Sequence, residues 1–289
     1  MSMSAVAREV GESDSTLWRI FNHYVNRAIN EQINLQDVRR IAVDETAHKR
    51  GHNYVTIFSD LDSGDVILVI EGRKQEVFEK LYEYMLTKGG DPQKVELFSM
   101  DMSKSYKAGH QKHFAHSQVV FDRFHIKKAV NEAVDKVRKA EAKYSQELKN
   151  TKYIWLKNEQ SLNDYQRQKL SEFLAESTLD TAIAYQMKTG FDTLWSVQPK
   201  AVEPLLQTWI ESAIKSTLKP FENLVNTIKN NYAGIIKSMK TGITNAAAEG
   251  LNSIIQMAKS RARGFRNMDN FKAMIYCLGN NFNFHFHTK

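Results

Sequence analysis

IAVDET, at Ile41–Thr46, is an apolar run that ends in two acidic residues, and a similar run, VELFSMD, occupies Val95–Asp101. Short apolar runs with polar ends are typical of buried strands. If both strands lie in one sheet, each brings a carboxylate to its end, and a metal ion could lie between them. Because side chains alternate along a strand, Asp44 and Glu45 cannot both face this site. Asp44 shares its face with the small Ala42, so we predict that Asp44 faces the metal. Glu45 would form a salt bridge or an indirect contact.

The composition is that of a soluble globular protein. A chain of 289 residues can form one large domain or two smaller ones. Its single cysteine, Cys277, excludes a disulfide framework and a cysteine-based zinc site, and it fits a reducing cytosol. No apolar run approaches the roughly 18 residues of a membrane helix, and no signal peptide opens the chain. We therefore expect a cytoplasmic protein without a membrane partner.

The formal net charge of +7 favours a polyanionic partner, although it could serve solubility alone. The distribution of charge strengthens the first interpretation. From Lys215 onward, 11 lysines and arginines stand against only three acidic residues. This C-terminal excess of positive charge indicates a nucleic acid as the partner.

The N-terminal residues predict a partial helix-turn-helix within residues 1–32. Two short helices, Ala5–Val10 and Ser13–Tyr24, flank Gly11, with Ser13 or Asp14 as the cap of the second. Ala7, Leu17 and Ile20 would seal the pair, and Arg19, Asn22 and His23 would face DNA. The alternative is an amphipathic helical arm.

The next block is rich in strand signals. The predicted strands are Ile41–Asp44, Tyr54–Leu61, Val66–Glu71, Val95–Asp101 and Gln118–Asp122, with helices at residues 77–86 and 103–114. This order matches the ribonuclease-H-like fold, whose sheet carries acidic residues on its first and fourth strands. We predict an α/β fold with a mixed five-stranded sheet flanked by helices.

Strand signals nearly vanish between about residues 126 and 232, which predicts a large all-α segment. Three tryptophans lie there, at Trp155, Trp195 and Trp209. Packing between helices is the favoured role for them over stacking on bases.

The sequence after the all-α segment predicts a helix that ends at about Arg263. One face of this helix carries Glu249, Asn252, Gln256, Lys259 and Arg263. Such a face suits a metal ion beside a phosphate backbone, or it is an ordinary solvated face.

Gly250 lies within this predicted helix, where glycine costs roughly 1 kcal/mol relative to alanine. A close approach to that turn of the helix would explain it. The start of this helix, which carries the Glu249 carboxylate, is therefore a candidate part of the metal site.

Five motifs carry a resemblance to a known family. They are VDET at Val43–Thr46, SMDMS at Ser99–Ser103, FDRFH at Phe121–His125, AEGLN at Ala248–Asn252 and RGFRN at Arg263–Asn267. From about residue 36 to 280 the chain resembles the DDE transposases of bacterial insertion sequences, specifically the ISL-three family. The resemblance implies a ribonuclease-H-like core interrupted by a helical insertion. We place the core at 36–130, the all-α insertion at 131–234, and the last catalytic helices with the C-terminal tail at 235–289.

The resemblance implies that Asp44, Asp101 and Glu249 are the metal-binding catalytic triad. The chemistry of magnesium gives the same assignment, because Mg²⁺ takes oxygen ligands and only one or two carboxylates per ion. Three acids can thus hold two ions about 4 Å apart, one activating the attacking oxygen and one stabilising the leaving oxygen. We expect Mn²⁺ to substitute for Mg²⁺.

Further residues are predicted near this site. Asp122 and His125 match the Asp-x-x-His signature of the family, whose histidine lies close to the active site; a structural role is the alternative. Lys104, Tyr106 and Lys107 stand at a helix start and would contact phosphate, unless they form a solvated face. DNA contacts are also predicted for Asn252, Gln256, Lys259, Arg263 and Arg266.

The expected function is DNA transposition, a form of DNA recombination. Water would first free a 3′-hydroxyl at the transposon end, and this hydroxyl would then attack target DNA. We expect at least a homodimer on DNA, in the bacterial cytoplasm and associated with the nucleoid. Family members usually begin with a cysteine-containing zinc-binding segment, which we expect to be lacking here. The alternatives are a truncated, non-catalytic DNA-binding regulator of transposition and a nuclease without strand transfer.

Overall fold

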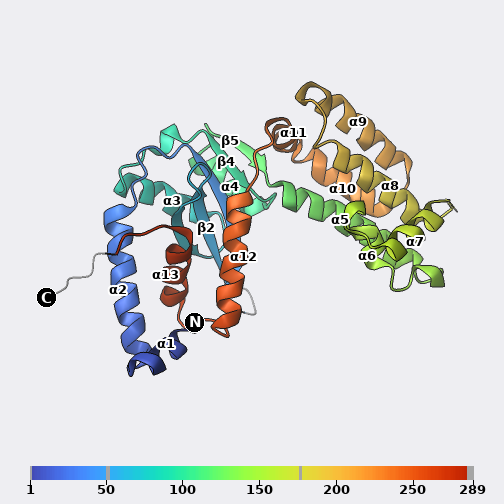
Figure 1. Cartoon of the computed structure of the whole chain (residues 1–289). Coiled ribbons are helices and arrows are strands. Elements are labelled where there is room, and N and C mark those ends of the chain that lie inside the picture. The colour runs from blue at the N-terminus through green and yellow to red at the C-terminus, as the bar shows by residue number, and fades with distance from the viewer. Residues whose placement is uncertain (1, 50–52, 176–177, 285–289) are drawn as a thin grey trace. The chain divides into compact units, whose positions relative to one another are not determined.

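The computed structural model describes residues 2–49, 53–175 and 178–284. The chain forms two compact units, one made of Met1–Val120 with Asn245–Lys289 and the other of Phe121–Thr244. Figure 1 shows strands surrounded by helices in the first unit and a group of helices in the second. The segment predicted as an all-α insertion lies within the second unit.

A five-stranded sheet in the order β3-β2-β1-β4-β5 forms the centre of the first unit. Its strands are β1 (Arg40–Ala47), β2 (Tyr54–Asp60), β3 (Val66–Glu71), β4 (Leu97–Met100) and β5 (Gln118–Phe121). β1 pairs with β2 in antiparallel and with β4 in parallel orientation, and β2 and β3 are antiparallel. The predicted fold class is therefore confirmed, with small shifts at the strand ends.

Helices cover both faces of this sheet. In the first unit they are α1 (Met3–Val10), α2 (Asp14–Gln32), α3 (Glu76–Thr87), α4 (Lys104–His113), α12 (Ala246–Arg261) and α13 (Met268–Gly279), with a 3₁₀ turn at Pro92–Lys94. On one face, Phe58 and Phe98 of the sheet pack on Phe78 of α3, with ring centroids 5.6 and 5.7 Å away. On the other, Val55 and Ile57 join the apolar side chains of α12 and α13. The alternation of β2 thus divides its residues between two cores.

The N-terminal helices differ in part from the prediction. Ser13 caps α2, since its hydroxyl accepts a hydrogen bond from Thr16 N at 3.1 Å, and Gly11 makes the turn at φ 72°. Ile20, however, is 44% exposed, so its predicted role in sealing the helix pair is wrong. α2 continues to Gln32 and buries Val25 and Ala28 instead.

Asn22 was predicted to face DNA, but its side chain contacts α13 instead. Its Nδ2 donates to Asn270 Oδ1 on α13 at 2.7 Å, so this side chain holds α2 to the rest of the unit. Arg19 and His23 are exposed. Only these two of the three predicted DNA-facing residues therefore remain candidates.

The second unit is helical over its described residues. It contains α5 (Arg123–Glu141), α6 (Lys152–Leu156), α7 (Asp164–Ala175), α8 (Asp180–Thr193), α9 (Pro199–Lys215), α10 (Lys219–Lys229) and α11 (Tyr232–Thr241), with 3₁₀ turns at Gln146–Leu148 and Glu159–Ser161. Trp155 is fully buried, and its ring lies 5.3 Å from that of Phe173. Trp209 lies 4.9 Å from Phe191. The packing role predicted for the tryptophans is confirmed for these two.

Candidate active site

The register of β1 and β4 places two predicted acids at the same level of the sheet. Ala42 of β1 is paired with Ser99 of β4 in parallel orientation. Two residues further along, Asp44 lies in β1 and Asp101 directly follows β4. Asp44 and Asp101 therefore stand at the ends of neighbouring parallel strands.

Asp44 and Glu45 lie on opposite faces of the sheet, as the alternation predicts. Asp44 of β1 is paired with Ile57 of β2, and Ile57 packs against the apolar side chains of α12 and α13. Glu45 is paired with Thr56 on the other face, and its Oε1 lies 3.5 Å from Arg73 Nη1. The salt bridge predicted for Glu45 is thus present.

Backbone N–H groups fix both aspartates. Glu45 N donates to Asp44 Oδ1 at 2.7 Å, and Ser103 N donates to Asp101 Oδ1 at 2.8 Å. Both side chains are half-buried. These hydrogen bonds fix the orientation of both carboxylate side chains.

The polar face of α12 runs along β1. Asn252 Nδ2 donates to Asp44 Oδ2, Gln256 Nε2 donates to Thr46 Oγ1 at 2.8 Å, and Lys259 Nζ donates to the carbonyl of Ala47. Successive turns of the helix thus bind successive positions of the strand. These three residues were predicted to contact DNA; the structure shows them anchoring α12 to β1, and DNA contacts by them stay a prediction.

Glu249 lies in the first turn of α12, one turn before Asn252 on the same side of the helix, and is exposed. Within the described ranges, no three Asp, Glu, His or Cys side chains lie close enough together to hold a metal ion. The structure therefore places Asp44 and Asp101 at the ends of neighbouring strands, and Glu249 does not form a three-residue metal group with them among the described residues. The triad stays a prediction.

No described part of the chain packs closely against Gly250, which lies beside Glu249. A Cβ at this position would meet no atom within 4 Å. The first turn of α12 is therefore open space on the side of Gly250.

Tyr106 lies under the acidic strand ends rather than on a phosphate-binding surface. It is 1% exposed, and its hydroxyl lies 2.9 Å from Thr56 Oγ1. Burial raises the pKa of Tyr106, and the nearby carboxylates of Glu45, Asp101 and Asp44 add to this rise. The predicted phosphate contact is wrong for Tyr106, whose side chain is part of the core.

Asp122 and His125 form a small local structure at the start of α5. Asp122 is 3% exposed and caps the helix by accepting from Phe124 N at 3.1 Å, and His125 Nδ1 lies 3.2 Å from Asp122 Oδ2. The Asp-x-x-His spacing thus positions the histidine through the helix cap. Both residues belong to the second unit, and their predicted closeness to the active site stays a prediction.

The remaining predicted DNA contacts are basic side chains at the surface of the first unit. Lys104 is exposed at the start of α4, and Lys107 is half-buried. Arg263 and Arg266 are exposed in the loop after α12, where Arg263 has φ 54° and the Arg266 carbonyl accepts from Lys49 Nζ at 3.0 Å. This loop lines a cavity of about 910 Å³, together with residues of α12 and β1.

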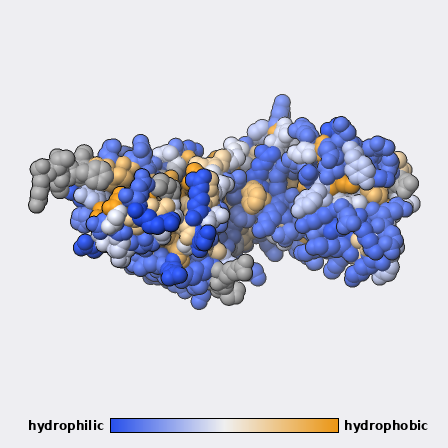
Figure 2. Space-filling view, turned by 60° about the horizontal axis from the view of Figure 1, so that its bottom comes forward, coloured by the Kyte–Doolittle hydropathy of each residue, from blue (hydrophilic) through white to orange (hydrophobic). Residues whose placement is uncertain are grey.

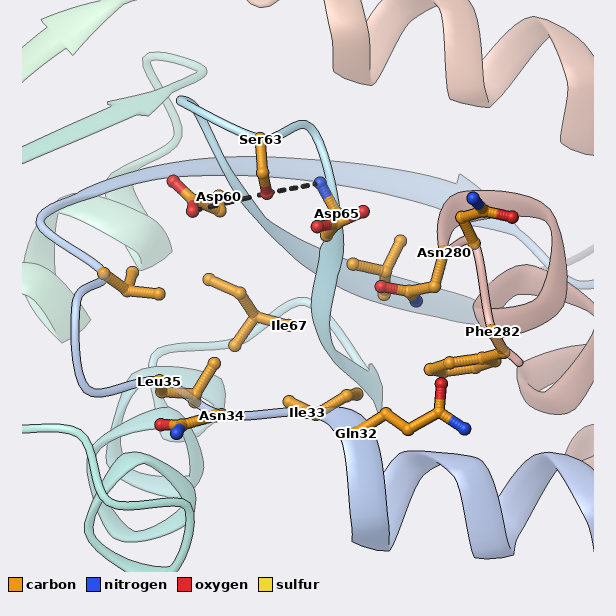
Figure 3. Close-up of a pocket in the computed structure, with 13 residues that line it drawn as sticks. Gln32, Ile33, Asn34, Leu35, Asp60, Ser63, Asp65, Ile67, Asn280 and Phe282 are labelled. Atoms are coloured by element: carbon orange, nitrogen blue, oxygen red, sulfur yellow. Dashed lines mark hydrogen bonds between the residues drawn. The ribbon is translucent and has the colours of Figure 1, made fainter. Parts of the chain in front are cut away.

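A second cavity, of about 350 Å³, lies beside the turn between β2 and β3 (Figure 3). Its acids serve the turn. Asp60 Oδ1 accepts from Asp62 N at 3.0 Å, and Ser63 Oγ accepts from Asp65 N at 3.1 Å. Figure 3 shows Asp60 and Asp65 on either side of Ser63, away from the apolar floor formed by Ile67. We assign the Asp60 carboxylate a structural role in this turn.

Sequence reasoning missed two partners of the site. Thr46 and the Ala47 carbonyl receive hydrogen bonds from α12, although neither was predicted to matter. The spacing of Asn252, Gln256 and Lys259 contained the signal, because a polar line on a helix can bind a strand as well as a ligand.

The comparisons with known proteins agree with this fold. A family model described as a transposase matches residues 41–275, and a model of the helix-turn-helix domain of transposase family ISL3 matches residues 1–25. The chain is 25% identical over 243 residues to the transposase for insertion sequence element IS1001 of Bordetella parapertussis, covering 81% of this chain and 59% of that protein. It is 22% identical over 287 residues to the transposase for insertion sequence element IS1557 of Mycobacterium tuberculosis, covering 90% and 62%. The chain thus spans about three fifths of the length of these relatives.

A mixed sheet with two acids at adjacent strand ends, matched along most of its length by the family model, defines a transposase of ribonuclease-H-like fold. The chain belongs to the ISL-three family of transposases. The two matched models describe a transposase and a helix-turn-helix domain of this family. Among the described residues, no helix is both long and apolar enough to span a membrane.

Proposed function

We propose that this chain is the catalytic region of a DNA transposase that cleaves transposon ends and transfers the freed strand into target DNA. The observation that supports the proposal most is the parallel pairing of β1 and β4, because Asp44 lies near the end of β1 and Asp101 directly follows β4.

The donors at these strand ends fit a hard divalent cation. Asp44 and Asp101 supply carboxylate oxygens, and the Oδ1 atom of Asn252 is buried without a hydrogen-bond partner among the described residues. Oxygen donors of this kind suit Mg²⁺, with Mn²⁺ as a substitute. We assign Asp44, Asp101 and Glu249 as the residues that would hold the metal. When bound, it would activate the attacking oxygen and stabilise the leaving oxygen.

The chain's own residues orient the reacting groups. The N–H groups of Glu45 and Ser103 fix the two aspartates, and the amide of Asn252 sets the distance between Asp44 and α12. Lys104, Arg263 and Arg266 are exposed cations on the same unit and would bind the DNA backbone. Water would then attack at the transposon end, and the resulting 3′-hydroxyl would attack the target strand. The protein would act on DNA as a dimer or larger homo-oligomer, because transposition pairs two ends.

The test is strand cleavage and joining on end-containing oligonucleotides with and without Mg²⁺. Asp44→Asn, Asp101→Asn and Glu249→Gln should each lower the cleavage rate by at least about a hundredfold, because each removes a charge that the reaction needs. Glu45→Gln is the matched control, since its carboxylate lies on the opposite face, and it should keep most of the activity. All four variants should bind DNA as the parent does.

Cleavage that survives Asp101→Asn would refute the assignment of the triad. DNA binding by the parent protein without any Mg²⁺-dependent cleavage would favour the other candidate, a non-catalytic regulator of transposition that occupies DNA. That candidate shares the exposed cations of the first unit, so only the cleavage assay separates the two.

A further inference from the structure

A groove between α5 and α6 in the second unit has a wall of lysines that the function proposed above does not use. Its cavity measures about 790 Å³ and is lined by Lys127, Lys128, Lys136, Lys139, Lys152 and Lys157. Only two acidic residues, Glu132 and Asp135, line it among the described part of the chain. The local charge is therefore strongly positive.

Ion pairs within the protein account for only some of this charge. Asp135 is bound by both Arg138 and Lys139, at 2.7 and 2.8 Å, and Lys127 pairs with Asp192 at 2.9 Å. Lys128, Lys136 and Lys157 are exposed and have no ion pair among the described residues. Like charges gathered without counter-charges repel one another, and an anionic partner relieves that repulsion.

We propose that this groove binds the sugar-phosphate backbone of duplex DNA, as a contact separate from those of the first unit. The proposal rests on the proposed function only in taking DNA as the partner. Lys128 and Lys136 lie two turns apart on α5, about 12 Å along the helix axis, which exceeds the reach of a single phosphate group. The opposite wall adds Lys157 and the polar side chains of Asn158 and Ser161.

The spread of cations along two walls fits an extended polyanion rather than a small anion. Duplex DNA offers a phosphate every 3.4 Å of axis along each strand, so several lysines can engage at once. Phe124, which is 55% exposed at the end of the groove, adds an apolar surface for the sugars. Figure 2 shows that hydrophilic residues cover most of the visible face of this unit.

The test compares two triple variants of the full chain. The first, Lys128→Gln with Lys136→Gln and Lys157→Gln, neutralises the groove. The second, Lys200→Gln with Lys215→Gln and Lys229→Gln, removes the same charge from exposed lysines of the same unit outside the groove. Binding to a duplex without transposon sequence is measured by fluorescence anisotropy over a range of salt, without divalent metal.

The groove variant should bind at least about tenfold more weakly near 0.1 M salt, and its salt slope should fall by about two to three, because each lost phosphate contact lowers the slope by about 0.9. The control should lose less than about twofold. Circular dichroism melting of both variants excludes unfolding as the cause.

Equal losses in both variants would show a non-specific effect of net charge and overturn the proposal, as would unchanged binding by the groove variant. A groove variant that binds DNA normally but loses binding to poly-glutamate would instead identify an acidic protein partner, and would also overturn it. The assay needs no cleavage, so its failure is distinct from a failure of the triad, which is read from Asp101→Asn.

Discussion

The two units position their charged groups by different means. In the first, the acidic strand β1 is bound by side chains of α12 that lie 208 to 212 residues further along the chain. In the second, the lysines of α5 share a groove because of the period of one helix. The first arrangement depends on long-range packing, whereas the second is local.

This difference predicts how each unit responds to change. The arrangement in the first unit should be sensitive to substitutions that disturb packing, since a shift of α12 or of the sheet separates the groups. The lysines on the α5 side of the groove should respond to salt and charge instead, since α5 itself fixes the spacing between them.

Gly109 tests the packing of the first unit. A Cβ at Gly109 would lie 2.6 Å from Phe78 Cδ2 and 2.7 Å from the Gln75 carbonyl, so α3 and α4 would have to separate. Gly109→Ala should lower the free energy of unfolding of the first unit by about 2–3 kcal/mol, as overpacking does. The measurement is denaturant unfolding, with hydrogen exchange to locate the loss.

Gly190→Ala in α8 is the matched control in the second unit. Its nearest neighbour would be Trp209 Cδ1 at 3.7 Å, an ordinary contact, so alanine should be neutral or stabilising there. A similar loss in both variants would contradict the contrast between the units.

Asn252 tests the contact between α12 and β1. Asn252→Leu keeps a similar volume but removes the donor to Asp44, so the half-buried carboxylate loses a charge-assisted partner. We expect a loss of about 1.5–2 kcal/mol in unfolding free energy and a lower cleavage rate. Gln256→Leu removes an uncharged hydrogen bond to Thr46, and the Gln256 side chain is exposed. This substitution should therefore lower the unfolding free energy by less. The reverse ranking would show that α12 is anchored mainly at its second half.

Lys188 tests a buried charge in the second unit. Its Nζ donates to the carbonyls of Trp155, Leu156 and Lys157 at 3.1, 3.1 and 2.8 Å, and burial lowers its pKa to about 8. Between pH 8 and the ordinary lysine pKa of 10.5, the unfolded chain binds more protons than the folded one, so stability should rise with pH. Because solvent partly screens the group, we expect a gain of about 1 kcal/mol.

The useful window for this test ends near pH 10, because burial raises the pKa of Tyr185 and the folded unit loses stability once unfolded tyrosines ionise. Thermal melts from pH 7 to 10 should therefore show a rise in the parent and a flatter profile in Lys188→Met. Equal slopes would contradict the assignment of the effect to Lys188.

Local patterns predicted the sheet well. The apolar runs that end at Asp44 and Asp101 gave both strands, and alternation alone assigned Asp44 and Glu45 to opposite faces. The parallel register of Ala42 and Ser99 then brought the two strand ends together. The fold class and the positions of Asp44 and Asp101 at strand ends could be predicted from the sequence, because strand signals are short-range.

The errors at Asn22 and Tyr106 arise from contacts between distant segments. Asn22 was expected to face DNA because nothing in its surroundings reveals the partner Asn270 on α13. Tyr106 was expected at the surface, but the helix start does not show which face packs on Thr56. The polar line on α12 was correctly identified as one face, yet its partner strand lies too far away in sequence to be predicted.

Gly250 provides the finest test, because it separates the needs of the fold from those of the substrate. The chain leaves open space around this glycine, so Gly250→Ala should stabilise α12 by about 0.5–1 kcal/mol through its helix propensity alone. Among the described residues, no packing contact therefore requires a glycine beside Glu249. If DNA occupies that space, the same substitution should lower cleavage while it raises the melting temperature. Opposite effects on stability and cleavage are what we expect; a gain in stability with unchanged cleavage would show that the substrate does not approach this turn.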